Sequence, residues 1–376
     1  MKITRNEAEN GRFSFPLPTY FIAKLVSQYP CVGDILDNLE SRYLGDRLEA
    51  IDVEAPVYVI GLARAGTTIT AEMLGEHREI ATHRYLNMVL PYVPYWFREF
   101  ARRTPLMTTP TERLHKDRLM VTRDSTEAVE EVFWQRYFGN TVDELKSSIV
   151  GNNGGNPEFE LLYRTHIKKL LLSQGASRYA AKNNYNVARM EYIKELFPDA
   201  KFVILVRNPF SHIASLAKQD VVLDNLRREN PLLQDWTKII GHRDLGFWKI
   251  CINLGDEETV RLIRSSWNQA VSYARGWALY WNHIYSYIAD LLADNENLRS
   301  SSIVIRYEDL CTSSSDTIDA IFSHIGISDE DYRRVRSVFS KALRQPSYYT
   351  AEFSDKETRD IREVTADVAE SYGYDI

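Results

Sequence analysis

The sequence predicts a three-layer α/β fold with a mainly parallel sheet. Two observations predict it: short apolar runs recur along the chain, and helical patterns lie between them. Short runs rich in β-branched residues are typical of parallel strands that are covered on both faces. Their alternation with helices favours a sheet between two helical layers. The predicted strands are Val57–Ile60, Ile80–Thr82, Tyr179–Ala181, Phe202–Val206 and Ser302–Ile305.

The helical patterns rest on apolar spacing and on start signals. Residues 67–76 and 186–197 each carry apolar side chains on one face. Asn208 and Pro209 form a strong helix start, because asparagine caps a helix and proline fits its first position. Further helices are expected over residues 265–294, which are rich in aromatic side chains, and within 316–376.

The length of the chain bounds its domain organisation. It has 376 residues, of which 44% are apolar, and this suffices to bury a core. We expect a single domain over residues 1–376, since α/β enzymes of this length often form one domain with insertions. Residues 91–157 interrupt the alternation and look helical only in parts. We interpret this segment as a helical insertion and a candidate cap over a substrate site.

Composition and charge argue against several function classes. The formal net charge of −6 disfavours nucleic acid as a partner, so any anion site must be local. Three cysteines lie far apart, in neither a metal-binding nor a disulfide pattern, which favours a reducing compartment. The N-terminus lacks the apolar run of a signal peptide, and no apolar stretch reaches the roughly 18 residues of a membrane span. We therefore expect a cytoplasmic protein without a transmembrane segment, and the sequence leaves its oligomeric state open.

A strand, a loop of small residues and a helix start follow one another over residues 57–68. Gly61 and Gly66 are spaced as in a Walker A loop, which turns backbone N–H groups and a helix N-terminus toward a phosphate. The Walker lysine is missing, and Thr67 stands in its place. The loop carries a cation at Arg64 instead. We predict a site for a monophosphate-like group that is poorly suited to ATP with magnesium.

A second cation lies at the end of another predicted strand. That strand ends at Arg207, and Ser211 and Ser215 share a face of the helix that follows. A Walker B strand would end in an acidic residue that holds magnesium. The arginine predicts an anion site that needs no metal.

Together these segments resemble the family of sulfotransferases that use 3′-phosphoadenosine 5′-phosphosulfate (PAPS). The first resembles the family's 5′-phosphosulfate loop. The second resembles its 3′-phosphate motif, in which a serine follows an arginine eight residues later. The clear resemblance covers residues 55–90 and 178–220, with a weaker match at 304–310, and the ordered pair of motifs makes it specific. The resemblance implies a P-loop-like sulfotransferase fold and PAPS as co-substrate, without a metal.

The resemblance also implies roles for individual residues. Arg207 and Ser215 would hold the 3′-phosphate. Contacts with the 5′-phosphosulfate would come from Arg64, Ala65, Gly66, Thr67 and Thr68. Ala65 departs from the serine of many members. That change removes at most one hydrogen bond, because backbone N–H groups do most of the cradling.

Two further residues follow predicted strands. Lys182 comes after the strand at 179–181, and ligands of open α/β sheets gather at this carboxyl edge. We expect Lys182 and Arg64 to face the transferring sulfuryl group; a solvated lysine at a strand end is the alternative. His83 follows the strand at 80–82, where members of this superfamily often place the base that deprotonates the acceptor. A neutral histidine suits that task.

The identity of the base stays open at this point. Arg84 and the donor-binding cations are expected to lower the pKa of His83 and keep it neutral. Alternatively, His83 packs under the loop or supports Arg84. The competing bases are His115, Glu130, Glu131 and His242.

The expected function is transfer of a sulfuryl group from PAPS to a hydroxyl group of an unidentified acceptor, with a carbohydrate or a small metabolite favoured. One alternative is a P-loop-type kinase acting on a small molecule, which the missing Walker lysine and acidic strand tip disfavour. Another is a non-catalytic nucleotide-binding module. A further cation, Arg306, is expected to pair with Glu308 or Asp309 in a structural turn.

Overall fold

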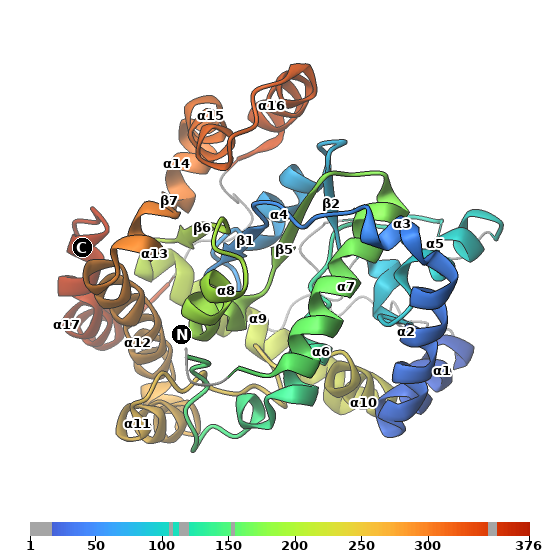
Figure 1. Ribbon diagram of the computed structural model, residues 1–376. Helices are drawn as coiled ribbons and strands as arrows, with labels where there is room; N and C mark the ends of the chain where they lie inside the picture. Colours follow the sequence, from blue (N-terminus) through green and yellow to red (C-terminus); the bar gives the residue numbers. More distant parts are fainter. Residues whose placement is uncertain (1–16, 105–107, 113–119, 152–154, 345–351) are drawn as a thin grey trace.

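A five-stranded parallel sheet forms the centre of the fold (Figure 1). The computed structural model describes residues 17–104, 108–112, 120–151, 155–344 and 352–376. The strand order is β2-β5-β1-β6-β7. The strands are β1 (Val57–Ile60), β2 (Ile80–Thr82), β5 (Arg178–Lys182), β6 (Lys201–Val206) and β7 (Ser302–Arg306). All five predicted strands are confirmed, each to within one residue at either end.

The sheet lies between two helical layers. Side chains alternate between the two faces of a strand. Val57 and Val59 therefore join one core cluster, whereas Tyr58 and Ile60 join the other. Figure 1 shows α15 and α16 on one side of the sheet and α12 and α17 on the other. The predicted three-layer α/β fold is confirmed.

Helices cover both faces. The first face packs against α4 (Thr67–Gly75), α14 (Tyr307–Thr312), α15 (Ser314–Ile325) and α16 (Glu330–Ala342). The opposite face packs against α7 (Pro157–Gln174), α8 (Met190–Leu196), α9 (Pro209–Glu229), α11 (Glu257–Trp267), α12 (Tyr273–Asp294), α13 (Glu296–Ser300), α17 (Asp355–Ser371) and the 3₁₀ helix η3 (Asn184–Arg189).

The remaining elements lie in the N-terminal part of the chain, between β2 and α7, and after α9. The N-terminal helices are α1 (Leu17–Gln28), α2 (Pro30–Leu44) and α3 (Asp46–Glu49), and α1 packs against α10 (Pro231–Ile239). Between β2 and α7 lie η1 (Tyr85–Met88), α5 (Pro94–Arg102), β3 (Thr111–Glu112), β4 (Met120–Val121), α6 (Glu131–Tyr137) and η2 (Gly139–Val142). The short antiparallel pair β3-β4 was not foreseen.

The prediction of one long aromatic helix over residues 265–294 is wrong in its first part. The chain leaves α11 at Trp267, turns through η4 (Ala270–Ser272) and re-enters a helix at Tyr273. The two helices pack closely at Gly276, where an added Cβ atom would lie 2.8 Å from Cδ1 of Trp267. The aromatic spacing marked a buried face but could not show that the chain folds back upon itself. The helix expected at 186–197 is likewise divided, into η3 and α8.

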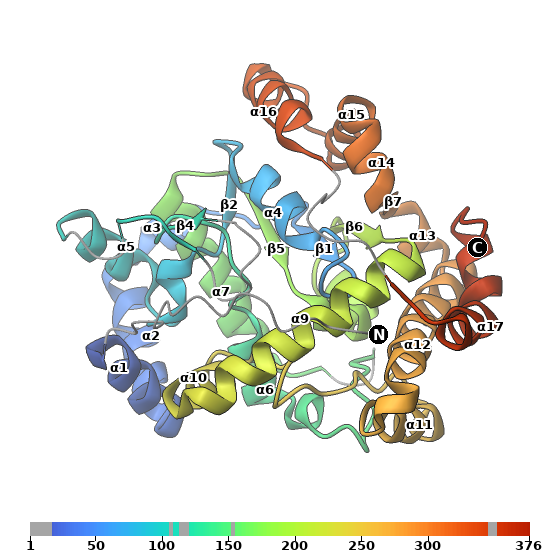
Figure 2. The ribbon, with the colours of Figure 1, turned by 180° about the vertical axis from the view of Figure 1, so that it is seen from behind.

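The strand order reverses direction at the point where ligands of such folds bind. Neighbouring strands β1 and β6 are followed by helices on opposite faces, α4 on one and α9 on the other (Figure 2). Loops that diverge in this way open a crevice at the carboxyl ends of the strands. The loop at 61–66 and the tip at Arg207 therefore meet at the expected ligand site of the fold.

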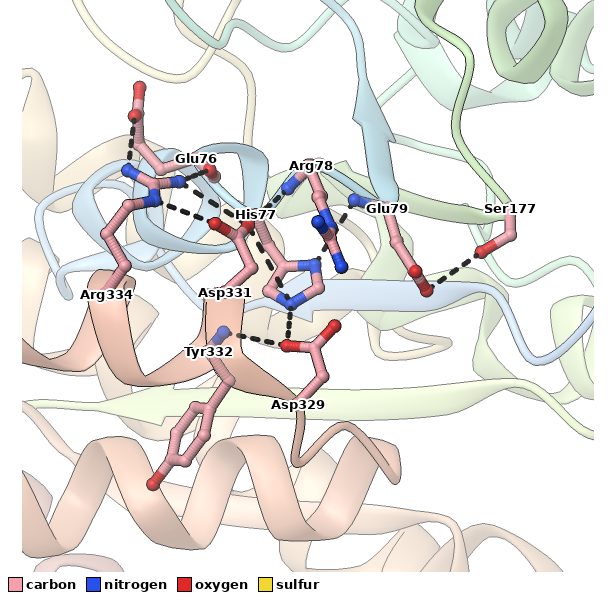
Figure 3. A network of polar contacts seen from close by, with 9 residues as sticks. All are labelled: Glu76, His77, Arg78, Glu79, Ser177, Asp329, Asp331, Tyr332 and Arg334. Carbon is pink, nitrogen blue, oxygen red and sulfur yellow. Dashed lines mark hydrogen bonds and ion pairs between the residues drawn. The ribbon is translucent and has the colours of Figure 1, made fainter.

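A polar network ties the far end of α4 to the C-terminal helices (Figure 3). The buried ring of His77 contacts Asp329 through Nε2 at 2.9 Å. The backbone N–H of Arg78 donates to Asp331 at 2.7 Å, and Arg334 pairs with the same carboxylate. This network anchors the helix whose N-terminus ends the loop at 61–66.

Candidate active site

The loop between β1 and α4 depends on two glycines. Gly61 has a φ angle of 144°, and a Cβ atom there would lie 2.5 Å from the carbonyl oxygen of Leu205. Gly66 has a φ angle of 98°, and its Cβ atom would lie 2.7 Å from Cδ2 of Tyr307. Any other residue would strain the backbone and push the loop away from its neighbours. The loop therefore packs tightly against β6 and the start of α14.

Arg64 lies in the middle of this loop in an uncommon conformation, with a φ angle of 71°. Conformations of this kind cost free energy and cluster at ligand sites. Nη1 of Arg207 donates to the carbonyl oxygen of Arg64 at 3.0 Å, and Nε of Arg64 donates to Oγ of Ser215 at 3.3 Å. The structure thus brings the two predicted anion motifs into direct contact.

Arg207 is held from several sides and is only 6% exposed. Its Nε donates to Oγ of Ser211 at 3.0 Å, and its guanidinium carbon lies 4.6 Å from the ring centroid of Tyr307. The indole N–H of Trp281 donates to the carbonyl of Arg207 at 3.2 Å. A guanidinium that is fixed in this way is preorganised to bind an oxyanion.

The start of α9 behaves as the sequence predicts. The side chain of Asn208 caps the helix by accepting the N–H groups of Phe210 and Ser211. The N–H of Asn208 itself donates to Glu308 at 3.2 Å, and the hydroxyl of Tyr374 donates to the same carboxylate at 2.6 Å. The C-terminal end of the chain therefore braces the strand tip that carries Arg207.

The buried side chain of His212 supports the loop through a hydrogen bond to its backbone. Nε2 of His212 donates to the carbonyl oxygen of Ala63 at 2.8 Å, which requires the proton on that nitrogen. Burial, followed by the charge of Arg207, lowers the pKa of His212 to about 3. His212 is therefore neutral at ordinary pH and adds no charge beneath the loop.

The other loop residues form the turn and the first positions of α4. Ala65 and Thr67 are buried, whereas Thr68 is partly exposed. The N–H of Ala65 closes the turn by donating to the carbonyl of Leu62 at 3.1 Å. The first N–H groups of a helix have no partner within it and are available to a ligand. The loop offers an anion the N-terminus of α4 at the position of Gly66, Thr67 and Thr68.

Lys182 is the last residue of β5 and pairs in register with Val59. It is half-buried, and across the described residues its side chain forms no hydrogen bond or ion pair. Its strand lies next to β1, so Lys182 ends one strand away from the loop. The lysine thus keeps its charge available at the edge where the loop begins.

His83 lies closer to the amino ends of the parallel strands than the sequence suggested. Thr82 pairs with Ala180, and Ala180 pairs with Val57 at the beginning of β1. The short strand β2 therefore ends level with the start of β1, three residues before the loop. His83 is 2% exposed. Its Nε2 lies 2.8 Å from Nε2 of His166, and its Nδ1 lies 3.1 Å from the hydroxyl of Tyr179.

The expected neutrality of His83 is confirmed, but its expected cause is wrong. Burial alone lowers the pKa of His83 to about 3. Arg84 turns away and donates to the carbonyl oxygens of Gly75 and Asp124, both at 2.8 Å. The sequence could not reveal this burial, because His166 comes from α7, far along the chain.

Glu130 and Glu131 are buried at the start of α6. The hydroxyl groups of Tyr163 and Tyr179 both donate to Glu130, the latter at 2.7 Å, and burial raises the pKa of this carboxyl group. Glu131 accepts two hydrogen bonds from Arg189, at 2.8 and 3.0 Å. It also accepts one from the amide of Asn183 at 2.9 Å. Both candidate bases are engaged in internal networks.

The remaining residues singled out from the sequence are the candidate bases His242 and His115 and the cation Arg306. Nε2 of His242 donates to the carbonyl of Ala128 at 2.9 Å. His115 lies outside the described residues. Arg306 forms a two-pronged ion pair with Asp309 at 2.8 and 2.9 Å, as the sequence predicted.

Sequence reasoning missed the aromatic residues that hold Arg207. Tyr307 packs on the guanidinium, and Trp281 and Tyr374 reach the same strand tip. Only Tyr307 carried a signal, since it lies within the weaker match at 304–310. The other two come from α12 and from beyond α17, and no local pattern connects them with the site.

The described part of the chain contains neither a metal-binding cluster nor a membrane-spanning helix. No group of three or more His, Cys, Asp or Glu side chains could hold a metal ion there. None of the described helices has the length and apolar character that a membrane crossing requires.

Comparisons with known proteins place the chain in a family. The model of the sulfotransferase family matches residues 56–249, more than half of the chain. The fold is similar to that of sulfotransferase STF9 from Mycobacterium avium, with a TM-score of 0.51 and 13% identity over 90% of this chain and 82% of that one. Sulfotransferase STF1 from Mycobacterium tuberculosis H37Rv gives a TM-score of 0.50 and 12% identity over 96% of this chain and 88% of that one. No curated protein sequence matches. The chain belongs to the sulfotransferase family.

Proposed function

We propose that this protein transfers a sulfuryl group from PAPS to a hydroxyl group of an acceptor. The observation that carries the proposal is the contact between the two anion motifs, in which Arg207 and Ser215 touch Arg64. Two guanidinium groups at one crevice suit a donor that carries two phosphate-type groups. Membership of the sulfotransferase family supports the type of reaction.

The donor would lie across the crevice between β1 and β6. In this arrangement Arg207 and Ser215 bind the 3′-phosphate. The 5′-phosphosulfate rests on the N-terminus of α4 and contacts Arg64, Ala65, Gly66, Thr67 and Thr68. Helix N-termini and backbone N–H groups favour such an anion without a metal ion.

The proposed chemistry is an in-line displacement at sulfur. The acceptor hydroxyl loses its proton to a base, and its oxygen forms a bond to sulfur. The bond between sulfur and the bridging oxygen breaks, and 3′,5′-bisphosphoadenosine leaves with that electron pair. Arg64, Lys182 and the N–H groups of the loop stabilise the charge that develops on the bridging and sulfuryl oxygens.

We assign His83 as the base that receives the acceptor proton. Its neutral ring has the required protonation state. Because the hydroxyl of Tyr179 donates to Glu130, Nδ1 of His83 carries the ring's proton and donates to the oxygen of that hydroxyl. To act as a base, Nε2 must therefore exchange its contact with His166 for the acceptor hydroxyl. Tyr179 connects His83 to Glu130, so the hydrogen-bonded chain could share the proton.

We also propose that residues 91–157 form a cap over the acceptor, with a carbohydrate or small hydroxylated metabolite as the favoured acceptor. The contact from Glu131 in α6 to Asn183 supports this placement, because Asn183 follows Lys182 at the end of β5. The insertion thus reaches the edge of the sheet where the lysine lies.

One titration separates this proposal from its alternatives. The protein is titrated with bisphosphoadenosine, PAPS and Mg-ATP, and sulfate transfer to carbohydrate and phenolic acceptors is then measured. Tight binding of the first two with transfer supports the proposal. Preference for Mg-ATP would indicate a kinase, and binding without transfer to any acceptor would indicate a non-catalytic nucleotide-binding module.

A further inference from the structure

A cationic cavity lies outside the proposed donor site. It has a volume of about 310 Å³ and is bounded by η1, by the C-terminal half of α5 and by the turn that follows β4. Half of its lining residues are arginines. The lining residues are Leu86, Arg98, Ala101, Arg102, Arg123 and Asp124. None of these residues belongs to the proposed donor site.

Arg98 is the central residue of this cavity. Its Nε atom is fully buried and has no hydrogen-bond partner, and within the described ranges its guanidinium forms no ion pair. Burial and the nearby charge of Arg102 both lower the pKa of Arg98. An arginine nevertheless stays charged in proteins. The described residues therefore include no counter-ion for this partly buried cation, an arrangement that costs free energy.

The neighbouring charges do not resolve this imbalance. Arg102 and Arg123 act on Arg98 as like charges, whereas Asp124 and Glu99 act as opposite charges. Each of these carboxylates already pairs with another arginine: Glu99 with Arg102 at 2.5 Å, and Asp124 with Arg123 at 3.4 Å. Each pair is neutral in sum, so within the part of the chain that the structure describes the charge of Arg98 is left without a counter-ion.

A further cation, Arg84, lies near Arg98. The charge of Arg98 contributes to lowering the pKa of Arg84, whose guanidinium donates to the carbonyls of Gly75 and Asp124. The carboxylates of Glu72 in α4, of Glu76 just after it and of Asp124 oppose this shift. Three arginines thus line the cavity and Arg84 lies near them; Arg84, Arg102 and Arg123 are held by internal contacts. Of these arginines, Arg98 is the one for which the described residues provide no such contact.

We propose that this cavity binds a compact tetrahedral oxyanion, phosphate or sulfate, either as the free ion or as a substituent of a larger molecule. The planar guanidinium fork matches the oxygens of such an ion in charge and geometry. Since a water molecule occupies about 30 Å³ in the liquid, the cavity holds a tetrahedral ion with part of its hydration or a small group attached to it.

The test is calorimetric binding of inorganic phosphate and inorganic sulfate to the full chain, with and without saturating bisphosphoadenosine. Arg98→Met is compared with Arg103→Met, which removes an exposed arginine just after α5 that does not line the cavity. We expect Arg98→Met to weaken ion binding by at least about tenfold, the effect of losing one charge-assisted hydrogen bond. Arg103→Met should leave it within about twofold.

Competition with bisphosphoadenosine separates this proposal from the proposed donor site. Ion binding that depends on Arg98 persists when the nucleotide is bound, and it persists also if the protein does not bind the nucleotide at all. Equal binding by the wild type and Arg98→Met overturns the proposal. Equal loss in Arg98→Met and Arg103→Met also overturns it, because net charge alone would then explain the binding.

Binding of a hexose monophosphate shows whether the ligand is the free ion or a substituent of a larger molecule. If it binds no more tightly than inorganic phosphate, the free ion is the ligand. If it binds more tightly and this gain is lost in Arg98→Met, the ligand is an anionic substituent of a larger molecule. Arg98→Lys guards against misfolding: it keeps the charge but loses the fork, and an affinity between those of the wild type and Arg98→Met is expected. Wild-type affinity in this variant for every ion tested overturns the assigned geometry.

Discussion

Arg207 donates a hydrogen bond from Nη1 to the backbone carbonyl of Arg64, at 3.0 Å. The residue proposed to bind one end of the donor therefore also holds the loop proposed to bind the other end. Arg64 has a φ angle of 71°, and this bond helps to keep it there. The two anion motifs, 143 residues apart in the sequence, form one structural unit.

Replacement of Arg207 should weaken binding of bisphosphoadenosine. Arg207→Ala removes a charge-assisted hydrogen bond to phosphate, and we expect a loss of about 1.5–3 kcal/mol in calorimetry. Arg306→Ala is the matched control, since Arg306 ends the neighbouring strand β7 but pairs with Asp309. Unchanged affinity in Arg207→Ala, or a strict requirement for magnesium, would contradict the assignment.

The loop should not tolerate a side chain at its last glycine. In Gly66→Ala the new Cβ atom would lie 2.7 Å from Tyr307, at a backbone angle that strains an alanine. We expect a loss of about 1–3 kcal/mol in the free energy of unfolding, together with weaker binding of bisphosphoadenosine. Gly139→Ala serves as the control, because a Cβ atom there meets nothing within 4 Å. Chemical denaturation of both variants measures the difference, and equal stability would show that the loop can move away from Tyr307.

The protein should distinguish donors by their 3′-phosphate. Adenosine 5′-phosphosulfate lacks the group assigned to Arg207 and Ser215, so it should bind at least about tenfold more weakly than PAPS. Competition against bisphosphoadenosine measures both affinities. If the two donors bind equally, Arg207 and Ser215 bind something other than a 3′-phosphate.

The sequence predicted the parts of this site that depend on neighbouring residues. The strand, glycines and helix start around Arg64 form a local pattern, and so do the strand tip and cap around Arg207. The position of His83 could not be predicted in this way. It follows from the short strand β2 and its register with β5, and from His166 on a distant helix. The approach of Tyr307 to Gly66 is equally non-local.

The buried histidines should make the free energy of unfolding depend on pH. The pKa of His83 falls to about 3 in the folded protein, against an ordinary value of 6.5. Between these values the unfolded chain binds a proton that the folded chain does not. Stability attributable to this group therefore rises with pH through this window and is lost as the pH falls from about 6.5 toward 3. The slope is about 1.4 kcal/mol per pH unit for one proton.

Denaturation of His83→Gln and wild type across this pH range isolates that contribution. Glutamine does not titrate, so the slope of stability against pH should decrease by one proton in the variant. A slope that is identical in the two proteins would mean that His83 is protonated in the folded state. His212, whose pKa is also lowered to about 3, still contributes its own slope in both proteins.

The assignment of the base requires two measurements on one variant. His83→Ala should lower turnover by roughly 10²–10⁴-fold, the usual contribution of a general base, and should leave bisphosphoadenosine binding nearly unchanged. If turnover survives, Glu131 and His115 are the next residues to replace. If binding falls together with turnover, His83 supports the fold of the site through Tyr179 and His166.

The central proposal for this protein is that PAPS is its sulfuryl donor. The most direct test is calorimetric titration of the wild-type protein with bisphosphoadenosine in the presence of a chelator of divalent metals, compared with titration with ATP and magnesium. Because Arg207 and Arg64 supply the cations and the loop lacks the Walker lysine, we predict tight binding of bisphosphoadenosine without metal and little binding of Mg-ATP. Binding of Mg-ATP in preference to bisphosphoadenosine would contradict the account.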